Sequence, residues 1–492
     1  MNKKPNILLI CTDQLRWDWI GTNGNNYVQT PQIDKLAAQG VNFQRAMSEC
    51  PTCVPARRML MTGLNTQGIN MSENRDTQEF TQGPKLAETL TRSGYQTFAA
   101  GKLHTWPPRN RLGFEDVQLN EEGRRQGTLK MDDYDRYLTR RGLSHLTYTH
   151  GLGNNQYGTR ISPLPTEATT TAWTGDQAVE FLDRRDPTRP FFLYVSFDKP
   201  HPPLTPPNEY WDLYEGVTFP NPAVGKWSQG AIPSRMQSLR NDFLRSTLAN
   251  RPYEVQQTLR GFAALITHID STIGFILGHL REMGELENTW IGFISDHGDH
   301  MYDHGNYAKG DFFAGSCRVP YLLVPPQSLG LSQACGTVDT THPVGLIDIM
   351  PTLLDAAGVD HDLKIDGQSL LPLIPGCGSK TNKPFRSMSF GHCTTCYGVS
   401  DGRYRYLWFG DDDMEYLFDQ DKDPKDLNNL LDQEQNHPFR NEARSALMAW
   451  MEKGSDPHVQ MKGNQKTLKP ISFNWNLDKG ESINIWNNRG RH

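Results

Sequence analysis

The sequence predicts an α/β fold in which a large mixed, mostly parallel sheet is sandwiched by helices and is followed by a smaller C-terminal α+β subdomain. Two observations predict it. Short apolar runs typical of buried strands alternate with amphipathic helices through the first part of the chain, as in a parallel sheet. From about residue 376 the strand patterns cluster around tight turns instead. We therefore expect a large domain over residues 1–375 and a C-terminal subdomain over 376–492.

The elements follow from the spacing of the apolar residues. Strands are expected at 6–11, 95–100, 190–197 and 290–295. Helices are expected at 30–39, 86–93, 172–182 and 253–283. The stretch 105–162, rich in Pro and Gly, is expected to be a long insertion near the functional edge. In the subdomain we expect antiparallel strands at 404–409 and 415–418, a closing helix at 441–453, and a polar tail wrapping the surface after Gly454.

The composition excludes two classes of partner. Of the 492 residues, 36% are hydrophobic, enough for a sizeable core. The net charge of −6 argues against nucleic-acid binding. No run approaches the ~20 apolar residues of a membrane span, so no membrane partner is expected. Because no secretory signal is visible, the expected location is cytoplasmic as written, and periplasmic or secreted if a leader was removed.

Polar side chains follow four of the expected strands directly. They are Asp13, Lys102, His201 and Asp296. Ligands of such sheets bind beyond the carboxyl ends of the strands, so these groups should converge on one edge. A single Asp at a strand end is more often a turn former or helix cap. Two of them, beside Gln14 and His297, favour a metal ion that relieves the repulsion of the carboxylates.

A surplus of cationic or protonatable groups accompanies these ligands. It consists of Arg57, Lys102, His104, His201 and Lys309. Each alone could be a surface charge, and for Lys309 alone that is the simpler interpretation. Together they favour a pocket for a tetrahedral oxyanion.

Two cysteine pairs have CxxC spacing, Cys50/Cys53 and Cys393/Cys396. Such a pair can be a redox couple, half of a metal site, or chance. For Cys393/Cys396 ordinary loop thiols or a local disulfide are the simpler interpretation. Cys50/Cys53 lacks the small thioredoxin-like context of a redox helix. If this segment is helical, Arg57 lies one turn after Cys53 and faces the same way.

The motifs of the chain, taken in order, resemble those of the type I, formylglycine-dependent sulfatases. They are PNILLI with TDQ at 5–10 and 12–14, CVPAR with MTG at 53–57 and 61–63, GKLH at 101–104, PHPP at 200–203, SDHGD at 295–299, YAKG to RVP at 307–320, and LFD to NL at 417–430. Only Cys53 fits the cysteine of the signature. The resemblance spans roughly residues 5–430 and implies an alkaline-phosphatase-like fold.

The resemblance also implies a chemistry. Cys53 would be oxidised to formylglycine by a formylglycine-generating enzyme. One divalent metal, most simply Ca²⁺ with Mn²⁺ or Mg²⁺ as alternatives, would be held by Asp13, Gln14, residue 53, Asp296 and His297. A hydrated aldehyde would attack sulfur and form a sulfated diol, with His201 as the acid for the leaving oxygen, assisted by Lys309. His104 would take a proton as the aldehyde reforms, while Arg57 and Lys102 hold the charges. His304 is a candidate substrate contact, with a loop hydrogen bond as the alternative.

Two departures from the usual pattern leave the substrate open. Gln14 and His297 resemble the choline-sulfatase and phosphonate-monoester-hydrolase branches, whereas Lys102 with His104 favours sulfate over phosphonate. Aromatic residues at positions 106, 173, 210 and 211 could line a sugar-sized cleft, although aromatics are more often core. We expect a sulfated small molecule or oligosaccharide as substrate. A phosphonate monoester or phosphodiester hydrolase, a choline or aryl sulfatase, and an inactive sulfated-glycan-binding protein remain alternatives, and a homo-oligomer is possible.

Overall fold

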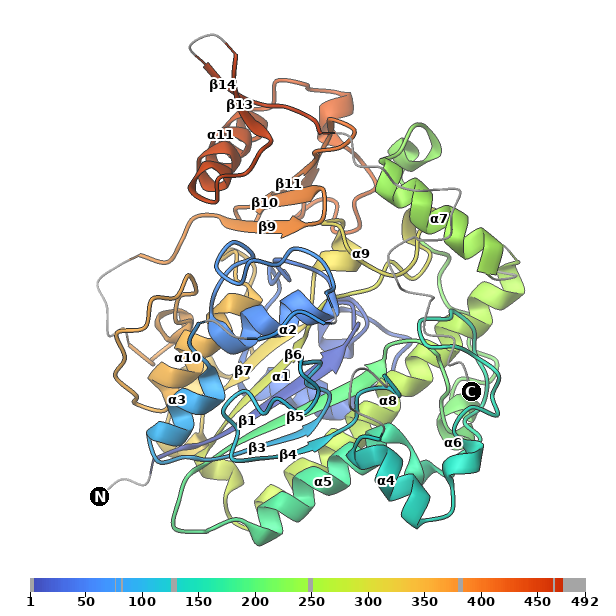
Figure 1. Ribbon diagram of the computed structural model, residues 1–492, viewed down its shortest axis with the longest axis vertical. Helices are drawn as coiled ribbons and strands as arrows, with labels where there is room; N and C mark the ends of the chain where they lie inside the picture. The colour runs from blue at the N-terminus through green and yellow to red at the C-terminus, as the bar shows by residue number, and fades with distance from the viewer. Residues whose placement is uncertain are drawn as a thin grey trace.

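The computed structural model is built around one eight-stranded sheet (Figure 1). It describes residues 4–471 apart from residue 76 and the segments 81–82, 125–130, 247–250, 379–383 and 463–464. The strand order is β4 (Asp116–Leu119), β3 (Gln96–Gly101), β5 (Phe191–Pro200), β1 (Asn6–Asp13), β6 (Thr289–Ser295), β7 (Tyr321–Val324), β2 (Val41–Phe43), β8 (Thr337–Asp339). The five strands from β4 to β6 are parallel, whereas β7 pairs antiparallel with both β6 and β2. The predicted mixed, mostly parallel α/β sheet is confirmed.

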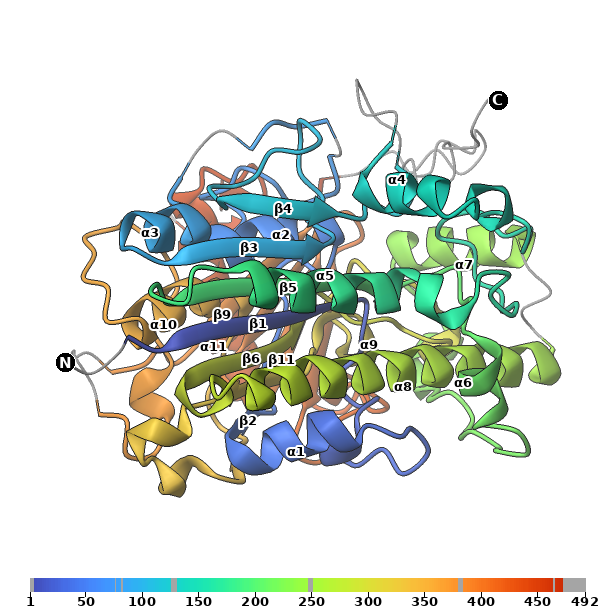
Figure 2. The same cartoon turned by 90° about the horizontal axis from the view of Figure 1, so that it is seen from below.

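The central strand β1 is buried on both faces, because its alternate side chains enter two different cores. Leu8 and Ile10 pack in the core that includes α1 (Pro31–Gln39), α5 (Thr170–Arg184) and α8 (Pro252–Glu282). Ile7 and Leu9 pack in the core that includes α3 (Leu86–Arg92), α10 (Ile349–Ala356) and α2 (Cys53–Thr62). Figure 2 shows the first group of helices on one side of the sheet. The alternation of β1 puts Asp13 on the same face as Ile7 and Leu9, which is the face of α2.

The long helix α8 is apolar on most of its surface because it is a core element. It is the one helix among the described residues whose length and hydropathy would suit a membrane span, contrary to the expectation from the sequence. However, 78% of its most apolar window is buried in the protein. Leu265, Ile269, Ile273 and Leu280 lie in the core beside β1 and β5, so the apolar side of α8 faces the sheet.

The expected insertion differs in part from the structure. Asp116–Leu119 forms the edge strand β4 of the main sheet, and α4 (Asp133–Arg140) follows with a capping box in which Asp132 accepts from the Asp135 N–H at 2.7 Å. The short strands β2, β7 and β8 were not predicted, because runs of three or four residues carry too little periodicity. The other described helices are α6 (Asn208–Asp212), α7 (Ser234–Ser246) and α9 (Ala314–Cys317).

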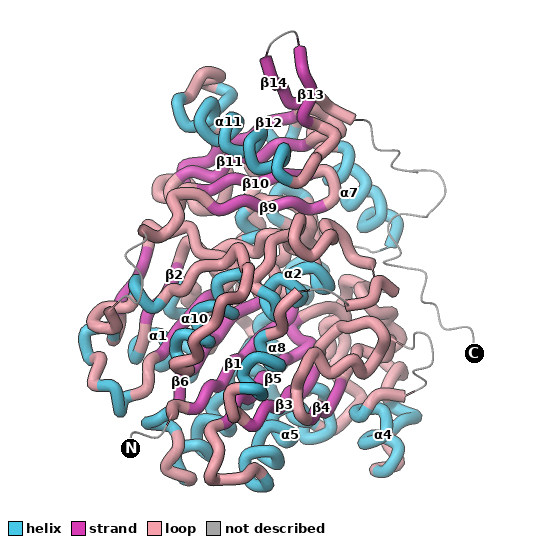
Figure 3. The backbone as a smooth tube through the Cα atoms, turned by 60° about the vertical axis from the view of Figure 1, so that its left-hand side comes forward, coloured by secondary structure: helices cyan, strands magenta, loops and turns pink. Residues whose placement is uncertain are grey.

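A four-stranded antiparallel sheet forms the C-terminal part and lies against the end of the α/β part where α9 is found (Figure 1). Figure 3 shows the same sheet above the α/β part. Its order is β12 (Met414–Asp419), β11 (Tyr404–Phe409), β10 (Cys396–Ser400), β9 (Ser389–Cys393). One face is covered by α11 (Pro438–Lys453), and a hairpin of β13 (Val459–Lys462) and β14 (Gln465–Leu468) follows. The part of the expected polar tail after residue 471 lies outside the described residues.

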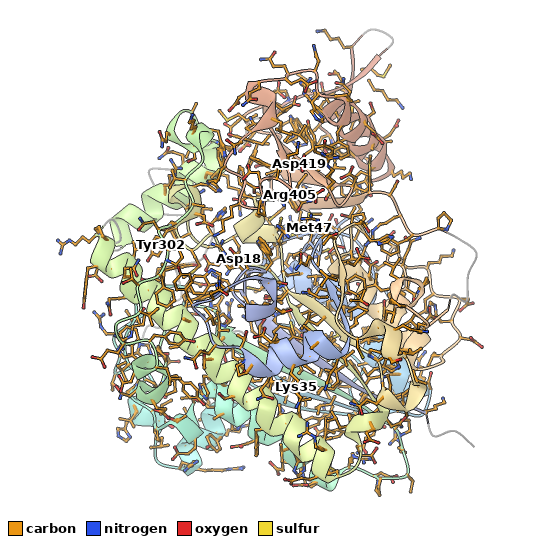
Figure 4. All side chains as sticks on the ribbon, turned by 180° about the vertical axis from the view of Figure 1, so that it is seen from behind. Asp18, Lys35, Met47, Tyr302, Arg405 and Asp419 are labelled. Carbon is orange, nitrogen blue, oxygen red and sulfur yellow. The ribbon has the colours of Figure 1, made fainter. Side chains whose placement is uncertain are left out.

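The other face of this sheet packs on the α/β part through an apolar and ionic seam. Phe312 and Phe313 contact the cluster of Leu407, Phe409 and Phe418. Figure 4 shows Arg405 on the C-terminal sheet and Met47 below it in the α/β part. Buried Arg405 pairs with Asp426, whose other oxygen accepts from the main chain at the start of α9 at 2.6 Å. The two parts therefore share one apolar cluster at the seam.

Candidate active site

Strands and a helix end bring the predicted site residues to one edge of the sheet. Asp13 ends β1, Lys102 follows β3, His201 follows β5, and Asp296 follows β6. The main-chain N–H of Asp296 donates to the Thr12 carbonyl at 3.2 Å, which joins the ends of β1 and β6. Helix α2 starts at Cys53, so the thiol lies at the N-terminal end of a helix that is buried over its whole length.

Four buried groups form a cluster that could hold a metal ion. Asp13, Cys53, Asp296 and His297 each place one ligand atom within 4.8 Å of the others. The Cys53 Sγ atom lies 3.1 Å from His297 Nε2 and 3.8 Å from Asp13 Oδ1. Two carboxylates with no solvent exposure repel each other unless positive charge lies between them. Hard oxygen donors with one imidazole suit a divalent cation, so the donor set fits one.

Arg57 holds the two carboxylates of this cluster in place. Its Nε donates to Asp296 Oδ2 at 2.9 Å, and its Nη2 donates to Asp13 Oδ2 at 3.1 Å. Its Nη1 is oriented by the Lys102 carbonyl at 2.8 Å and the Ser196 hydroxyl at 2.7 Å. One helical turn after Cys53, the guanidinium thus bridges β1, β3, β5 and β6.

Lys102 is fully buried between two carboxylates from different parts of the chain. Its Nζ donates to Asp13 Oδ2 at 2.5 Å and to Glu122 Oε2 at 2.8 Å. Glu122 comes from the loop after β4. Although burial raises the pKa of Glu122, the charges of Lys102, His201 and Arg124 outweigh it and hold that pKa well below its ordinary value.

His104 is held by the same loop. Its main-chain N–H donates to the Glu121 carboxylate at 3.0 Å, and its Nε2 lies 3.1 Å from Arg124 Nη1. A hydrogen bond also joins His104 to the Cys53 thiol. His104 has a left-handed backbone with φ of 54°, so the Glu121 contact helps to hold a conformation that L residues seldom adopt.

His201 has one nitrogen fixed and one open. Its Nδ1 lies 2.6 Å from the Pro202 carbonyl and 3.5 Å from Glu122 Oε1. Its Nε2 is buried and has no hydrogen-bond partner among the described atoms. A carbonyl accepts only, so Nδ1 carries a proton. Nε2 is then the position that can exchange a proton with a bound molecule.

Gln14 and Lys309 connect the cluster to the loop after β6. The main-chain N–H of Gln14 donates to Asp296 Oδ1 at 3.1 Å, and its side-chain oxygen accepts from Lys309. Its amide nitrogen donates to Asp299 and to the hydroxyl of Tyr157. Gln14 therefore lies beside the four-group cluster and orients Lys309 toward it.

The charges around Cys53 favour its ionised form. Burial raises the pKa of the thiol. The charges of Lys309, Lys102 and His297 and the hydrogen bond from His104 lower it by more, so that the pKa lies well below its ordinary value. Burial and the neighbouring Asp13 raise the pKa of Asp296. The cluster thus concentrates negative charge that the cationic side chains only partly balance.

The structure separates the two cysteines of the first CxxC pair. Cys50 interacts with Cys393 and Thr52 and lies in the apolar cluster under the C-terminal sheet. Cys53 instead faces Asp13 and His297. Both are free thiols, and so are Cys393 and Cys396. Cys393 and Cys396 lie opposite each other on strands β9 and β10 rather than in a loop. The divergent contacts argue against a redox couple of Cys50 with Cys53.

His304 is placed in a packed layer. Its ring lies 4.8 Å from that of Trp227 and 6.0 Å from that of Phe313, and its Nδ1 accepts from the Gly225 N–H at 3.2 Å. Burial lowers its pKa to about 4. These contacts correspond to the loop hydrogen bond weighed as the alternative for this residue. Trp173 is likewise a core residue, 1% exposed beside Tyr134 and Leu138.

Sequence reasoning did not find several residues that shape the site. They are Glu121, Glu122, Arg124, Tyr157, Ser196 and Asp299. Three of them lie in the loop after β4, where no periodic pattern indicates which way a side chain points. Asp299 lies in the SDHGD stretch at 295–299, and its spacing from Asp296 is the sequence signal that could have indicated it.

Comparison with known proteins agrees with this geometry. The sulfatase family profile matches residues 5–359, and that of the C-terminal part of N-sulphoglucosamine sulphohydrolase matches 302–453. An arylsulfatase of Clostridium perfringens is 33% identical over 448 residues, covering 88% of this chain and 91% of its own. The phosphonate monoester hydrolase of Agrobacterium radiobacter superposes with a TM-score of 0.76 at 23% identity, covering 95% and 100% of the two chains.

A further solved structure has the same fold. It was determined in complex with its substrate D-glucosamine-2-N,6-O-disulfate and superposes with a TM-score of 0.71 at 21% identity, covering 92% of this chain and 99% of its own. The family profile covers most of the chain, and the buried cluster at the edge of the sheet is built from the motif residues. This chain is therefore a member of the sulfatase family and an enzyme that hydrolyses sulfuric esters.

Proposed function

We propose that the enzyme hydrolyses a sulfate ester of a carbohydrate, using a formylglycine made from Cys53 and one divalent cation. The observation that carries the proposal is the position of Cys53. Its thiol lies at the start of α2 within 4.8 Å of three further ligand groups, and Lys102, Lys309 and His104 surround it. A redox or purely structural thiol does not require this combination of ligands and cations.

Asp13, Asp296, His297 and residue 53 would hold the cation, with Gln14 beside them. Ca²⁺ is our first choice because two of the four ligand residues are carboxylates, and the imidazole keeps Mn²⁺ and Mg²⁺ open. When bound, the cation would neutralise the oxygens of the ester and lower the pKa of the attacking hydroxyl.

The protein side chains divide the remaining work. His201 donates a proton from Nε2 to the leaving oxygen, because Nδ1 is tied to the Pro202 carbonyl. Lys309, held by Gln14, lies close enough to Cys53 to assist at the same side. His104 is hydrogen-bonded to residue 53 and accepts the proton released as the enzyme is regenerated. Arg57 keeps Asp13 and Asp296 in position throughout.

The carbohydrate part of the proposal is supported by a neighbour and by the chain itself. The structure determined with a disulfated glucosamine shares the fold over 92% of this chain. A cavity of about 120 Å³ adjoins Glu122 and is lined by Tyr134, Asp198, Thr169 and Tyr148. Mixed hydroxyl, carboxylate and aromatic walls suit a hydroxyl-rich ring.

Mass spectrometry and sulfate release test the proposal together. The peptide containing Cys53 should show an aldehyde in place of the thiol, and the protein should release sulfate from a panel of sulfated sugars. Cys53→Ala should abolish release, whereas Cys335→Ala, at an exposed thiol, should retain it. Full sulfate release by Cys53→Ala in a preparation whose wild-type counterpart carries the aldehyde would refute the mechanism.

Hydrolysis of a phosphonate monoester is the second candidate. The phosphonate monoester hydrolase of Agrobacterium radiobacter shares the fold. Gln14 and His297 resemble the phosphonate-monoester-hydrolase branch. Lys102 and His104 favour sulfate. Matched rates on 4-nitrophenyl sulfate and a 4-nitrophenyl phosphonate discriminate between them, and faster phosphonate hydrolysis would establish the second candidate.

A further inference from the structure

A carboxylate that no motif contains lies among the cations of the active site. Glu122 Oε2 accepts from Lys102 Nζ at 2.8 Å and from Arg124 Nε at 3.0 Å, and its Oε1 lies 3.5 Å from His201 Nδ1. The Glu122 side chain is 5% exposed. Its backbone is left-handed with φ of 55°, a conformation of a non-glycine residue that tertiary contacts must hold.

Glu122 also lies near the reacting position. Lys102 connects it to Asp13 through a single ammonium group. The negative charge of Cys53 raises the pKa of Glu122 against the stronger lowering by Lys102, His201 and Arg124. A molecule bound at residue 53 in contact with Lys102 and His201 would therefore lie within electrostatic range of this carboxylate.

Glu122 offsets the positive charge of two cationic side chains near residue 53. Arg57 is paired with Asp13 and Asp296, and Lys102 and Arg124 are paired with Glu122. Lys309 has its described hydrogen bond with the neutral amide of Gln14. Without Glu122, Lys102 would keep one carboxylate partner, Asp13, which also pairs with Arg57. Arg124 would lose its ion pair with Glu122. Glu122 thus removes one unit of attraction for an anion beside the reacting atoms.

We propose that Glu122 is a specificity-determining residue that selects singly charged esters over doubly charged ones. A sulfate monoester carries one negative charge, whereas a phosphate monoester carries two once its second proton is lost near pH 6. The additional charge of the phosphate meets the Glu122 carboxylate in a buried site, where screening is weak. This inference rests on the proposed sulfate-ester hydrolysis and deepens it.

The same carboxylate promotes product release. Hydrolysis converts a monoanionic ester into dianionic inorganic sulfate, so the bound charge grows by one during the reaction. Repulsion from Glu122 is therefore greater for the product than for the substrate. A site tuned to a monoanion releases the dianion more readily, which reduces inhibition by sulfate.

Three substrates with one leaving group test the proposal at pH 8. They are 4-nitrophenyl sulfate and 4-nitrophenyl phenylphosphonate, each with one charge, and 4-nitrophenyl phosphate with two. In Glu122→Gln we expect kcat/KM for the phosphate relative to the sulfate to rise at least about tenfold, because one unit charge at this range is worth roughly ten- to a hundredfold. The ratio of phosphonate to sulfate should change less than about threefold. The inhibition constant of inorganic sulfate should fall by about tenfold.

Two variants separate charge from structure. Glu122→Asp keeps the charge and should keep the wild-type phosphate-to-sulfate ratio. Glu121→Gln removes the charge of the neighbouring carboxylate, which holds the main chain of Leu103 and His104. This variant should lower kcat/KM for all three substrates by the same factor. Thermal unfolding establishes that each variant folds. If Glu122→Gln does not fold, the Asp variant and the wild-type inhibition constants of singly and doubly charged 4-nitrophenyl esters decide the question.

The proposal is overturned if Glu122→Gln changes kcat/KM for all three substrates by the same factor, or if kcat/KM rises as much for the phosphonate as for the phosphate. It is also overturned if Glu122→Asp shows the same phosphate-to-sulfate ratio as Glu122→Gln. In the folded wild type, equal inhibition by singly and doubly charged esters would also overturn it. Sulfate release by the wild type tests the proposed function separately, since it does not depend on these ratios.

Discussion

Replacement of Arg57 by leucine should destabilise the protein strongly without metal and much less with it. Arg57 is 4% exposed and bridges Asp13 and Asp296, which are fully buried. Removing one partner of a buried ion pair costs about 3–5 kcal/mol, because the remaining charge is left uncompensated. Here two carboxylates lose the same partner, so we expect a loss near 5 kcal/mol of unfolding free energy in a chelator.

A divalent cation bound by the proposed ligand cluster would replace the lost charge between the two carboxylates. A ligand at a thousand times its dissociation constant stabilises the folded state by about 4 kcal/mol, and the variant should gain more from it than the wild type does. We therefore expect the difference in unfolding free energy to fall below about 3 kcal/mol in saturating Ca²⁺. Urea unfolding followed by fluorescence, with EDTA or with Ca²⁺, measures both values.

Arg58 is the matched control on the same helix. Its guanidinium donates to the main-chain carbonyls of Gln78 and Glu79 and contacts the ring of Phe80. Arg58→Leu removes no partner of a carboxylate, so its cost should be the same in EDTA and in Ca²⁺. An Arg57→Leu cost that is equally independent of Ca²⁺, or smaller than that of Arg58→Leu, would refute the reasoning.

Three further predictions concern protonation, backbone space and the leaving group. Burial, aided by the charge of Asp348, raises the pKa of Glu49 from 4.5 to about 8. The contribution of protonated Glu49 to stability is therefore complete below pH 4.5 and is lost as the pH rises through 8, by up to about 1.4 kcal/mol per pH unit. The difference in urea midpoint between wild type and Glu49→Gln should change over this window, and a constant difference would contradict the assignment. A Cβ on Gly101, whose φ is 100°, would overlap the Ser196 carbonyl, so Gly101→Ala should displace Lys102 and lower both melting temperature and kcat/KM; unchanged values for both would show that β3 shifts freely. His201→Asn should lower kcat on a sugar sulfate by about 10²–10⁴-fold and on 4-nitrophenyl sulfate far less, because nitrophenolate leaves without a proton; equal losses would exclude His201 as the acid.

Much of the fold follows from local pattern. The four predicted parallel strands are long apolar runs, and burial on both faces makes such runs readable. The helices predicted at 172–182 and 253–283 carry regular apolar stripes. In the structure both ends of each helix lie within two residues of the predicted bounds. Strands β2, β7 and β8 span three or four residues, and their pairing depends on distant partners that no local pattern records.

The site divides in the same way. Asp13, Lys102, His201 and Asp296 could be placed together from sequence, since parallel strands end at one edge of the sheet. The direction of a loop side chain depends on what packs against it. Only the folded chain could therefore show that Cys50 faces Cys393, that His304 packs on Trp227, and that Glu122 pairs with Lys102.

The sequence alone determined the layered α/β architecture and the order of ligands along the strands, because periodicity and strand-end position are local properties of the chain. The motif resemblance already assigned Cys53, and not Cys50, to the ligand set. Only the tertiary structure introduced Glu121, Glu122 and Arg124 into the site. These contacts join segments from β1, β3, β5 and the loop after β4. Their energies exist only once those segments are packed together and shielded from water.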